Sequence, residues 1–347
     1  MSSPEGEGML ASSMIQRVLV VRLGAIGDVV NALVFATALK REHPEIEVGW
    51  VAHPLVVPLV KDHPHVDRVH VWKRGGGVGE FLRVVRELRS KRYDLAVDLQ
   101  RLQKSALLAR LSGASRVLGY DRRRTKEQSW IWLKERIQKG DPKAHMVTQY
   151  LEVVRALGLK TDGSLHELPK EEAAESWADE EIRRLGGAPL LLNLGATKPA
   201  NRWEPERFGE LAGRLAADFA HPVCLTGGPS DKALAEVARA KAGPKIHDLC
   251  GATSLVQLIA LCRRARLFVT ADTGPMHIAA ACGVPIVALF GAADARRTGP
   301  YGEGHRVVAE HPACAPCEKR HCRMPRHVCM EDLSVDSVFR AIAGSLT

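Results

Sequence analysis

The 347-residue chain lacks any apolar run near the roughly 18 to 20 residues that a membrane-spanning helix needs. Aromatic residues make up only 5%, which disfavours nucleic-acid recognition by base stacking. No segment resembles an RNA- or DNA-reading module, and no D-x-D metal-binding motif is present. These absences argue against an integral membrane protein, against nucleic acid as a partner and against a metal held by that motif.

The composition and the start of the chain indicate a globular protein that stays in the cytoplasm. Hydrophobic residues make up 46% and charged residues 26%, as in soluble proteins, and the length fits two α/β domains. Residues 1–14 are mostly polar, with no basic flank before an apolar core. We predict a disordered tail there and not a secretory signal.

The formal net charge of +9 is confined to one half of the chain. Residues 1–170 hold 28 Lys and Arg against 19 Asp and Glu, whereas residues 171–347 hold 21 of each. A solvated basic surface is one interpretation. The other is that the first half meets something anionic: a nucleic acid, a membrane surface or an acidic substrate.

Buried strand patterns alternate with amphipathic helix patterns, and this alternation occurs twice. Strands are predicted at 17–23, 46–52, 66–72, 93–99, 190–194, 223–226, 246–249, 267–270 and 285–290. Helices are predicted at 29–42, 78–92, 103–111, 145–157, 170–185, 205–218, 230–242, 255–264, 275–282 and 334–342. The fold class is therefore α/β, with two Rossmann-like domains in series.

Loop-rich segments mark the predicted domain boundaries. Residues 15–168 form the first domain, residues 169–347 the second, and residues 334–342 a closing helix. Residues 120–142 are predicted to be irregular, and a cysteine-rich loop spans 311–330. Such domains bind ligands at the carboxyl ends of their strands, so we expect a central cleft facing both sheets.

Asp28 is the candidate catalytic residue of the first domain. It ends the segment Gly24-Ala25-Ile26-Gly27-Asp28, which joins the first strand to the first helix. The glycines permit a tight turn, but their spacing is not that of a dinucleotide-binding motif. Asp28 is either the N-cap of the helix or a general base.

Three loops of the second domain carry candidate ligand-binding residues. Residues 195–203 contain Thr197, Lys198, Arg202 and Trp203, and two cations with a hydroxyl suit a phosphate group. Residues 271–277 lead from a strand into a helix N-terminus, which favours anions. The tight turn at 227–229 has Asp231 close behind it. In each case the alternative is a structural role in a solvated loop, an N-cap or the core.

These motifs together resemble glycosyltransferase family 9, which contains the ADP-heptose:lipopolysaccharide heptosyltransferases. The resemblance covers about residues 15–345, through V-R-L-G-A-I-G-D, G-A-T-K-P-A-N-R-W, L-T-G-G-P-S-D and T-A-D-T-G-P-M-H-I-A-A-A-C-G-V-P. It implies a GT-B fold, an ADP-heptose donor, an acceptor in the lipopolysaccharide inner core, inversion at the transferred carbon and no obligatory catalytic metal.

The resemblance also implies roles for single residues. Asp28 matches the general base, and the matched donor-binding positions are Thr197, Arg202, Trp203, Asp231, Asp272, Thr273, Gly274 and His277. Several family members carry Lys where this chain has Asn201, so we expect Lys198 to reach the donor phosphates instead.

The basic first half gains a specific interpretation from the resemblance. A lipid A-core acceptor carries phosphates and acidic sugars at the cytoplasmic face of the inner membrane, where the protein is expected to make peripheral contact. The candidate acceptor contacts are Arg101, Lys104, Arg122, Arg123, Arg124 and Lys126. A solvated basic face remains the alternative for each of them.

Four of the eight cysteines are clustered, at Cys314, Cys317, Cys322 and Cys329. Four thiols suit a structural zinc or iron ion, and free cysteines or a redox-linked disulfide are the alternatives. The sequence does not connect this cluster with sugar transfer. The other four, Cys224, Cys250, Cys262 and Cys282, are expected to be small buried apolar residues.

Two other functions remain open at this point. One is a transferase of the same fold that uses another nucleotide sugar or another acceptor, including a protein. The other is a non-catalytic nucleotide-binding protein with a metal knuckle, whose basic half contacts nucleic acid. Asp28 together with Asp272 and His277 argues against the second, because a binding protein needs no carboxylate on the acceptor side.

Overall fold

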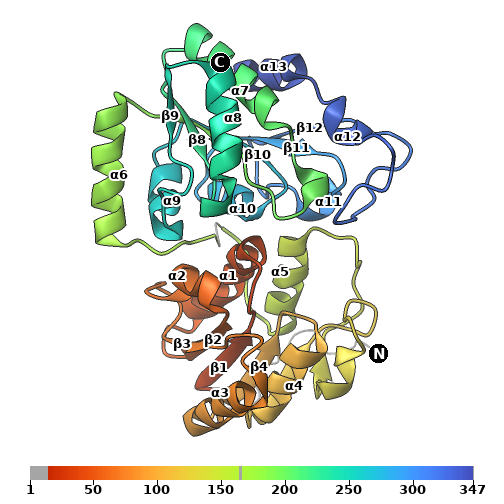
Figure 1. The fold of residues 1–347 in the computed structure, drawn as a ribbon. Helices are drawn as coiled ribbons and strands as arrows, with labels where there is room; N and C mark the ends of the chain where they lie inside the picture. Colours follow the sequence, from red (N-terminus) through yellow and green to blue (C-terminus); the bar gives the residue numbers. More distant parts are fainter. Residues whose placement is uncertain (1–14, 164–165, 347) are drawn as a thin grey trace. The chain divides into compact units, whose positions relative to one another are not determined.

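The computed structural model describes residues 15–163 and 166–346, and the chain divides into two units between Pro169 and Lys170 (Figure 1). The sequence placed this boundary one residue earlier. The predicted tail, residues 1–14, lies outside the described residues. Within the described ranges, no helix is long and apolar enough to cross a membrane.

Unit 1 is built on a parallel sheet with the strand order β3-β2-β1-β4-β5-β6. Its elements are β1 (Arg17–Val21), α1 (Ile26–Glu42), β2 (Glu47–Ala52), α2 (Val57–Val60), β3 (Arg68–Val71), α3 (Gly77–Lys91), β4 (Leu95–Asp98), α4 (Gln103–Leu111), β5 (Arg116–Gly119), β6 (Glu135–Arg136) and α5 (Met146–Ala156). Chain order reverses between β1 and β4, where Val21 pairs with Asp98. Ligands of parallel sheets bind at such a reversal, beyond the carboxyl ends of the strands.

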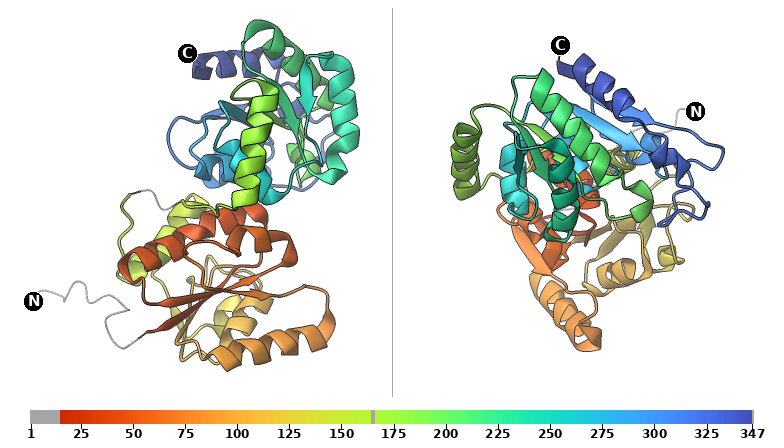
Figure 2. Two further views of the ribbon diagram at one scale, coloured as in Figure 1. Left: turned by 90° about the vertical axis from the view of Figure 1, so that its left-hand side faces the viewer. Right: turned by 45° about the horizontal axis from the view of Figure 1, so that its top comes forward.

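Helices cover both faces of this sheet because its central strands are apolar on both sides. Leu19 and Val21 of β1 pack with Val84 and Leu88 of α3 in one buried cluster. On the opposite face α1 packs against α5 (Figure 2). Alternate side chains of a strand point to opposite faces, so β1 serves both layers. The next residues, Arg22 to Ala25, are thereby fixed at the carboxyl edge of the sheet.

Unit 2 repeats this architecture with the strand order β12-β11-β10-β7-β8-β9, also parallel. Its elements are α6 (Glu172–Leu185), β7 (Leu190–Asn193), α7 (Pro205–Asp218), β8 (Val223–Thr226), α8 (Lys232–Ala242), β9 (Ile246–Asp248), α9 (Leu255–Cys262), β10 (Leu267–Ala271), α10 (Gly274–Ala281), β11 (Ile286–Phe290), α11 (Ala295–Thr298), β12 (Arg306–Ala309), α12 (Val328–Glu331) and α13 (Val335–Leu346). Strand order reverses between β7 and β10, the position that corresponds to β1 and β4 in unit 1.

One face of the unit 2 sheet is covered by α7, α8 and α13, which share a buried cluster with alternate residues of β7, β8, β10 and β11. The helix α9 packs against both α10 and α6. Three loops follow the adjacent strands β10, β7 and β8. They therefore emerge at the same edge.

The sequence missed the short elements β5, β6, β12, α2, α11 and α12. Each has only two to four residues, too few to show a period of 2.0 or 3.6. The region 120–142, predicted to be irregular, contains β6 and the 3₁₀ turn Ser129–Trp132. The strand β12 is half-exposed at the sheet edge, so it lacks the apolar pattern of a buried strand.

Candidate functional site

Asp28 lies in the first turn of α1, beyond the carboxyl end of β1. The N-cap of α1 is Ala25 and not Asp28, so the N-cap interpretation of Asp28 was wrong. The carboxylate instead forms an ion pair with the guanidinium of Arg22. The Arg22 side chain is only 4% exposed and that of Asp28 is 38% exposed, so one end of this ion pair is open to solvent.

Arg22 is held in the core of unit 1 by several groups. Its Nη1 donates to the carbonyl of Leu99 over 3.2 Å, and its guanidinium lies 6.0 Å from the Tyr150 ring. Burial disfavours the charged form, but the carboxylate of Asp28 and the other acidic groups nearby outweigh it and raise the pKa of Arg22. Arg22 is therefore a fixed cation that orients the Asp28 carboxylate.

Asp98 is a buried carboxyl at the end of β4, directly beside this pair. Its Oδ1 accepts the backbone N–H of Gln100 over 3.0 Å. Burial raises the pKa of Asp98 to about 6, and its hydrogen bonds and the charge of Arg22 only partly oppose this. Asp98 is thus a second acid next to Arg22, which the sequence did not single out.

The raised pKa of Asp98 predicts a pH dependence of stability. An Asp in the unfolded chain has a pKa near 3.8, so the folded protein binds this proton more tightly than the unfolded one. The stabilisation that comes from this bound proton is present below about pH 4 and is lost as the pH rises through 6. Relative to Asp98→Asn, the wild type should lose about 2 kcal/mol of unfolding free energy between about pH 4 and pH 7.

Urea denaturation of both proteins at the two pH values measures this difference. The control is Asp62→Asn, because Asp62 is exposed and should give the same difference from the wild type at both pH values. A pH-independent gap between the wild type and Asp98→Asn would show that Asp98 is ionised throughout.

Two of the predicted acceptor contacts are buried inside unit 1. Arg101 is 8% exposed, and its Nη1 donates to Gln149 Oε1 over 2.7 Å. Arg124 is buried and forms ion pairs with Asp121 and Glu152. These guanidinium groups hold unit 1 together and do not belong to an exposed basic face.

The remaining predicted contacts, Lys104, Arg122, Arg123 and Lys126, are exposed. The guanidinium of Arg122 lies 4.8 Å from the Trp130 ring centroid, and that of Arg136 lies 5.8 Å from it. Ile131, which follows Trp130 in the chain, is 50% exposed. An aromatic ring in contact with two cations, with an apolar neighbour, is thus part of the basic surface.

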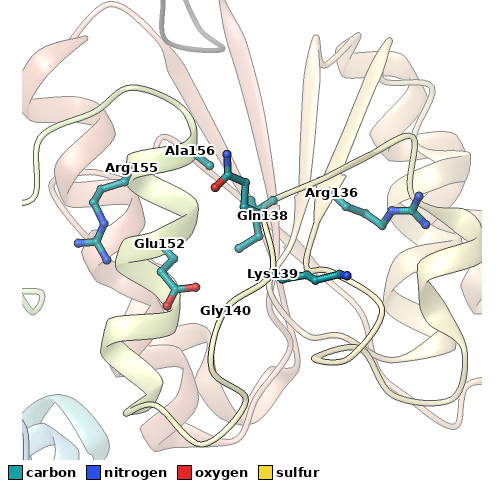
Figure 3. Close-up of a pocket in the computed structure, with 8 residues that line it drawn as sticks. Arg136, Gln138, Lys139, Gly140, Glu152, Arg155 and Ala156 are labelled. Carbon is teal, nitrogen blue, oxygen red and sulfur yellow. The ribbon is translucent and has the colours of Figure 1, made fainter. Parts of the chain in front are cut away.

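A cavity of about 540 Å³ is lined by residues 136–140 and by Glu152, Arg155 and Ala156 of α5. Figure 3 shows Arg136 and Lys139 pointing away from α5, and Gln138 and Glu152 beside the space. Glu152 is already paired with Arg124. The cavity therefore offers no converging set of cations, and we assign it no ligand.

In unit 2 the loops after β7, β8 and β10 are tied together by buried polar side chains. Asn193 Nδ2, at the end of β7, donates to the carbonyl of Gly195 over 3.0 Å and to Thr270 Oγ1 over 3.2 Å. Asp231 Oδ2 accepts the backbone N–H of Gly228 over 2.8 Å. A Cβ built at Gly195 would lie 2.4 Å from Asp231 Oδ2, so only glycine fits there.

Asn201 ties the loop after β7 to the loop after β10. Its Nδ2 donates to Asp272 Oδ2 over 3.1 Å and approaches the Asp272 carbonyl at 3.4 Å. Thr273, and not Asp272, is the N-cap of α10, so the N-cap interpretation of Asp272 was also wrong. Asn201 stands where several family members carry Lys. It has a structural role in this chain, because it holds Asp272.

Lys198 and Arg202 flank the 3₁₀ turn Pro199–Asn201. Among the described residues neither forms a salt bridge with a carboxylate. Arg202 Nε donates to the Ala196 carbonyl over 3.2 Å, and Thr197 is exposed beside it. The turn thus presents two cations without a paired carboxylate, as an anionic ligand requires.

Trp203 has a structural role in the core of unit 2. It is 2% exposed, its Nε1 donates to the Leu333 carbonyl over 2.9 Å, and it packs edge-on against Phe208. The alternative interpretation, that Trp203 fixes the following helix to the core, is therefore confirmed.

The start of α10 combines a helix N-terminus with a buried histidine. Thr273 and Gly274 begin the helix, and Thr273 makes no side-chain capping hydrogen bond. His277 is 8% exposed, one turn into the helix. Free backbone N–H groups of a helix N-terminus favour an anion, so Lys198, Arg202 and α10 form a candidate site for an anionic ligand, which we call the anion-binding edge of unit 2.

The model of glycosyltransferase family 9 (heptosyltransferase) matches residues 81–327. The chain belongs to this family. It is 30% identical to lipopolysaccharide heptosyltransferase 1 of Pseudomonas aeruginosa over 320 residues, which cover 88% of this chain and 87% of that protein. The chain is therefore a glycosyltransferase, as its motifs predicted.

Solved structures of the family show the same fold. The family 9 glycosyltransferase from Veillonella parvula superposes with a TM-score of 0.84 at 22% identity, covering 96% of this chain and 97% of its own. The E. coli heptosyltransferase WaaC with ADP gives a TM-score of 0.74 at 24% identity, covering 95% and 99%. The GT-B fold predicted from the sequence is confirmed.

Proposed function

We propose that this chain transfers heptose from ADP-heptose to the inner core of lipopolysaccharide, with inversion. The observation that carries the proposal is the link in unit 2 between the turn that bears Lys198 and Arg202 and the start of α10, which Asn201 makes by its hydrogen bond to Asp272. The names of the relatives and the ADP present in one of their structures support the same donor.

Each unit supplies one part of the proposed chemistry. The acceptor hydroxyl oxygen attacks the anomeric carbon and loses its proton to the Asp28 carboxylate of unit 1. The bond from that carbon to the β-phosphate oxygen breaks, and its electron pair leaves with ADP. Lys198, Arg202 and α10 of unit 2 stabilise the charge that builds on the β-phosphate. These cations fill the role that a catalytic metal has in other transferases.

Asp231, Asp272, Thr273, Gly274, Thr197 and His277 are assigned to the rest of the donor. Asp231 Oδ2 already accepts a backbone N–H, which leaves Oδ1 to accept a ribose hydroxyl. Asp272 is held by Asn201 and suits the sugar hydroxyls.

A donor comparison tests the substrate class. Purified protein is titrated with ADP-heptose, ADP and UDP-glucose, and binding is measured by calorimetry. Tighter binding of the two adenine nucleotides supports the proposal. If only UDP-glucose binds, the chain is still a family 9 transferase, but ADP-heptose is not its donor.

Asn201→Ala should weaken ADP binding by roughly tenfold, because a lost polar tether of this kind costs about 1 to 1.5 kcal/mol. The variant releases Asp272 from the turn that carries Lys198 and Arg202. Calorimetry with ADP measures the effect, with Gln138→Ala in unit 1 as the control. An unchanged dissociation constant would mean that the tether does not position the donor site.

Peripheral contact with the cytoplasmic face of the inner membrane is assigned to the surface around Trp130. Its support is the pair Arg122 and Arg136 at this ring and the half-exposed Ile131. Interfacial tryptophan and basic side chains favour an anionic lipid surface. Lys104, Arg122 and Arg123 are assigned to the phosphates and acidic sugars of the lipid A-core acceptor.

Ile131→Glu should weaken binding to phosphatidylglycerol vesicles roughly tenfold, through lost apolar insertion and added repulsion. Co-sedimentation measures the bound fraction. Val78→Glu is the control, since Val78 is 74% exposed on α3. If both variants lose vesicle binding equally, the surface around Trp130 is not the membrane contact.

Finally, any metal held by this chain is proposed to be structural and to lie at the cysteine cluster, apart from the reacting groups.

A further inference from the structure

Cys314, Cys317, Cys322 and Cys329 line one small cavity of about 50 Å³ in unit 2, although they are spread over sixteen residues of the chain. Cys329 is anchored in α12 and is buried. A Cβ built at Gly291 would lie 2.8 Å from its Sγ, so the backbone after β11 packs directly on this thiol. The other three thiols come from the loop that faces it.

The four thiols are free and line the same cavity. None of the four forms a disulfide. Within the described ranges, no three His, Cys, Asp or Glu side chains already form a group that could hold an ion. Coordination would therefore require these thiols to turn inward together.

The chemistry of the donors identifies the ligand class. Four thiolates select a single soft divalent ion in tetrahedral coordination, which is zinc or ferrous iron. His327 also lines the cavity, but its Nε2 is hydrogen-bonded to the Ala200 carbonyl at 3.0 Å. The four cysteines therefore remain as the ligand set, and binding releases their thiol protons to solvent.

The loop that carries the thiols is hydrogen-bonded to the proposed donor-binding turn at Ala200, through both the N–H and the carbonyl of that residue. The Ala200 N–H donates to the Arg320 carbonyl over 3.1 Å, and His327 meets the Ala200 carbonyl. The next residue, Asn201, holds Asp272. A hydrogen-bonded path of three residues therefore joins the cysteine loop to the anion-binding edge.

We propose that Cys314, Cys317, Cys322 and Cys329 bind one zinc or ferrous ion, and that the ion fixes the turn at Ala200 that presents Lys198 and Arg202 to the donor. Residues 310–327 contain no helix or strand, and such a long loop needs a clamp to hold one conformation. The cysteines are positioning residues, and this role rests on the proposed donor site.

Metal analysis of the purified full-length chain is the first test. About one zinc or iron ion per chain is expected, and Cys314→Ser and Cys322→Ser should each lose most of it. Both thiols are exposed, so the variants should fold. Cys282→Ser, outside the cluster, is the control and should keep the metal. Cobalt loaded in place of the native ion should show thiolate charge-transfer absorption that the two variants lack.

The second test separates positioning from mere stability. Loss of the ion, by chelation or in the variants, should raise the KM for ADP-heptose and the Kd for ADP about tenfold, with kcat changed less than about twofold. Zinc or iron restored to the chelated wild type should reverse the effect.

Four titratable free thiols without metal, or disulfides among them, would overturn the metal site. A metal whose loss leaves the Kd for ADP unchanged would overturn the positioning role. Metal counts do not depend on the donor, so a chain that holds the ion but binds no ADP would instead overturn the proposed function and with it the positioning role.

Discussion

Asp28→Asn is expected to lower kcat for heptose transfer by ~10² to 10⁴-fold, the usual contribution of a general base. The substitution keeps the size of the side chain and a hydrogen bond to Arg22, but it removes the basic oxygen. ADP affinity should not change, because the donor contacts are assigned to unit 2. The measurements are ADP release with saturating donor and acceptor, and calorimetry with ADP.

Two controls show whether the loss of activity comes from the Asp28 carboxylate itself and not from any lost carboxylate or from unfolding. Asp62→Asn removes an exposed carboxylate elsewhere in unit 1 and should retain full activity. Thermal unfolding of Asp28→Asn should show a folded protein, because Arg22 keeps its hydrogen bond to Leu99 and its contact with Tyr150. A folded Asp28→Asn variant with normal kcat would mean that another group takes the proton.

Arg202→Ala should lower kcat/KM for ADP-heptose by ~10² to 10³-fold, which is the typical cost of removing one preorganised donor from a developing anion. Lys198→Ala should lower it by a similar factor, since Asn201 leaves Lys198 to reach the phosphates. ADP should bind both variants more weakly. Steady-state kinetics and calorimetry measure the two effects.

Lys245→Ala is the matched control, since it removes an exposed cation from the same unit. If Lys198→Ala binds ADP as tightly as the wild type, Lys198 is a bystander and the phosphate site rests on Arg202 and α10 alone. If Arg202→Ala also behaves as wild type, the anion-binding edge is misassigned.

The sequence predicted the two-unit α/β fold because long buried strands and amphipathic helices have clear periods. It also placed the loops that matter, since motifs after β1, β7, β8 and β10 must lie at the carboxyl edges of the sheets. It did not predict which side chains in those loops are buried. Arg101 and Arg124 look like Arg122 in the sequence, yet only Arg122 is exposed.

Long-range partners explain what the sequence missed. Arg22 and Asp98 meet only because β1 and β4 are neighbours. Asn201 meets Asp272 across 71 positions of the chain. The capping interpretations of Asp28 and Asp272 failed for a local reason, because each helix begins at a different residue than expected. The site residues themselves were found through motifs, and their roles stay predictions.

Acceptor-dependent release of ADP is the most direct test of the central claim. Wild-type protein is incubated with ADP-heptose, with and without a heptose-deficient lipopolysaccharide core, and ADP is followed over time. We expect ADP to appear only with the acceptor and the core to gain the mass of one heptose. Tight binding of ADP-heptose with no transfer to any core acceptor would contradict the central claim.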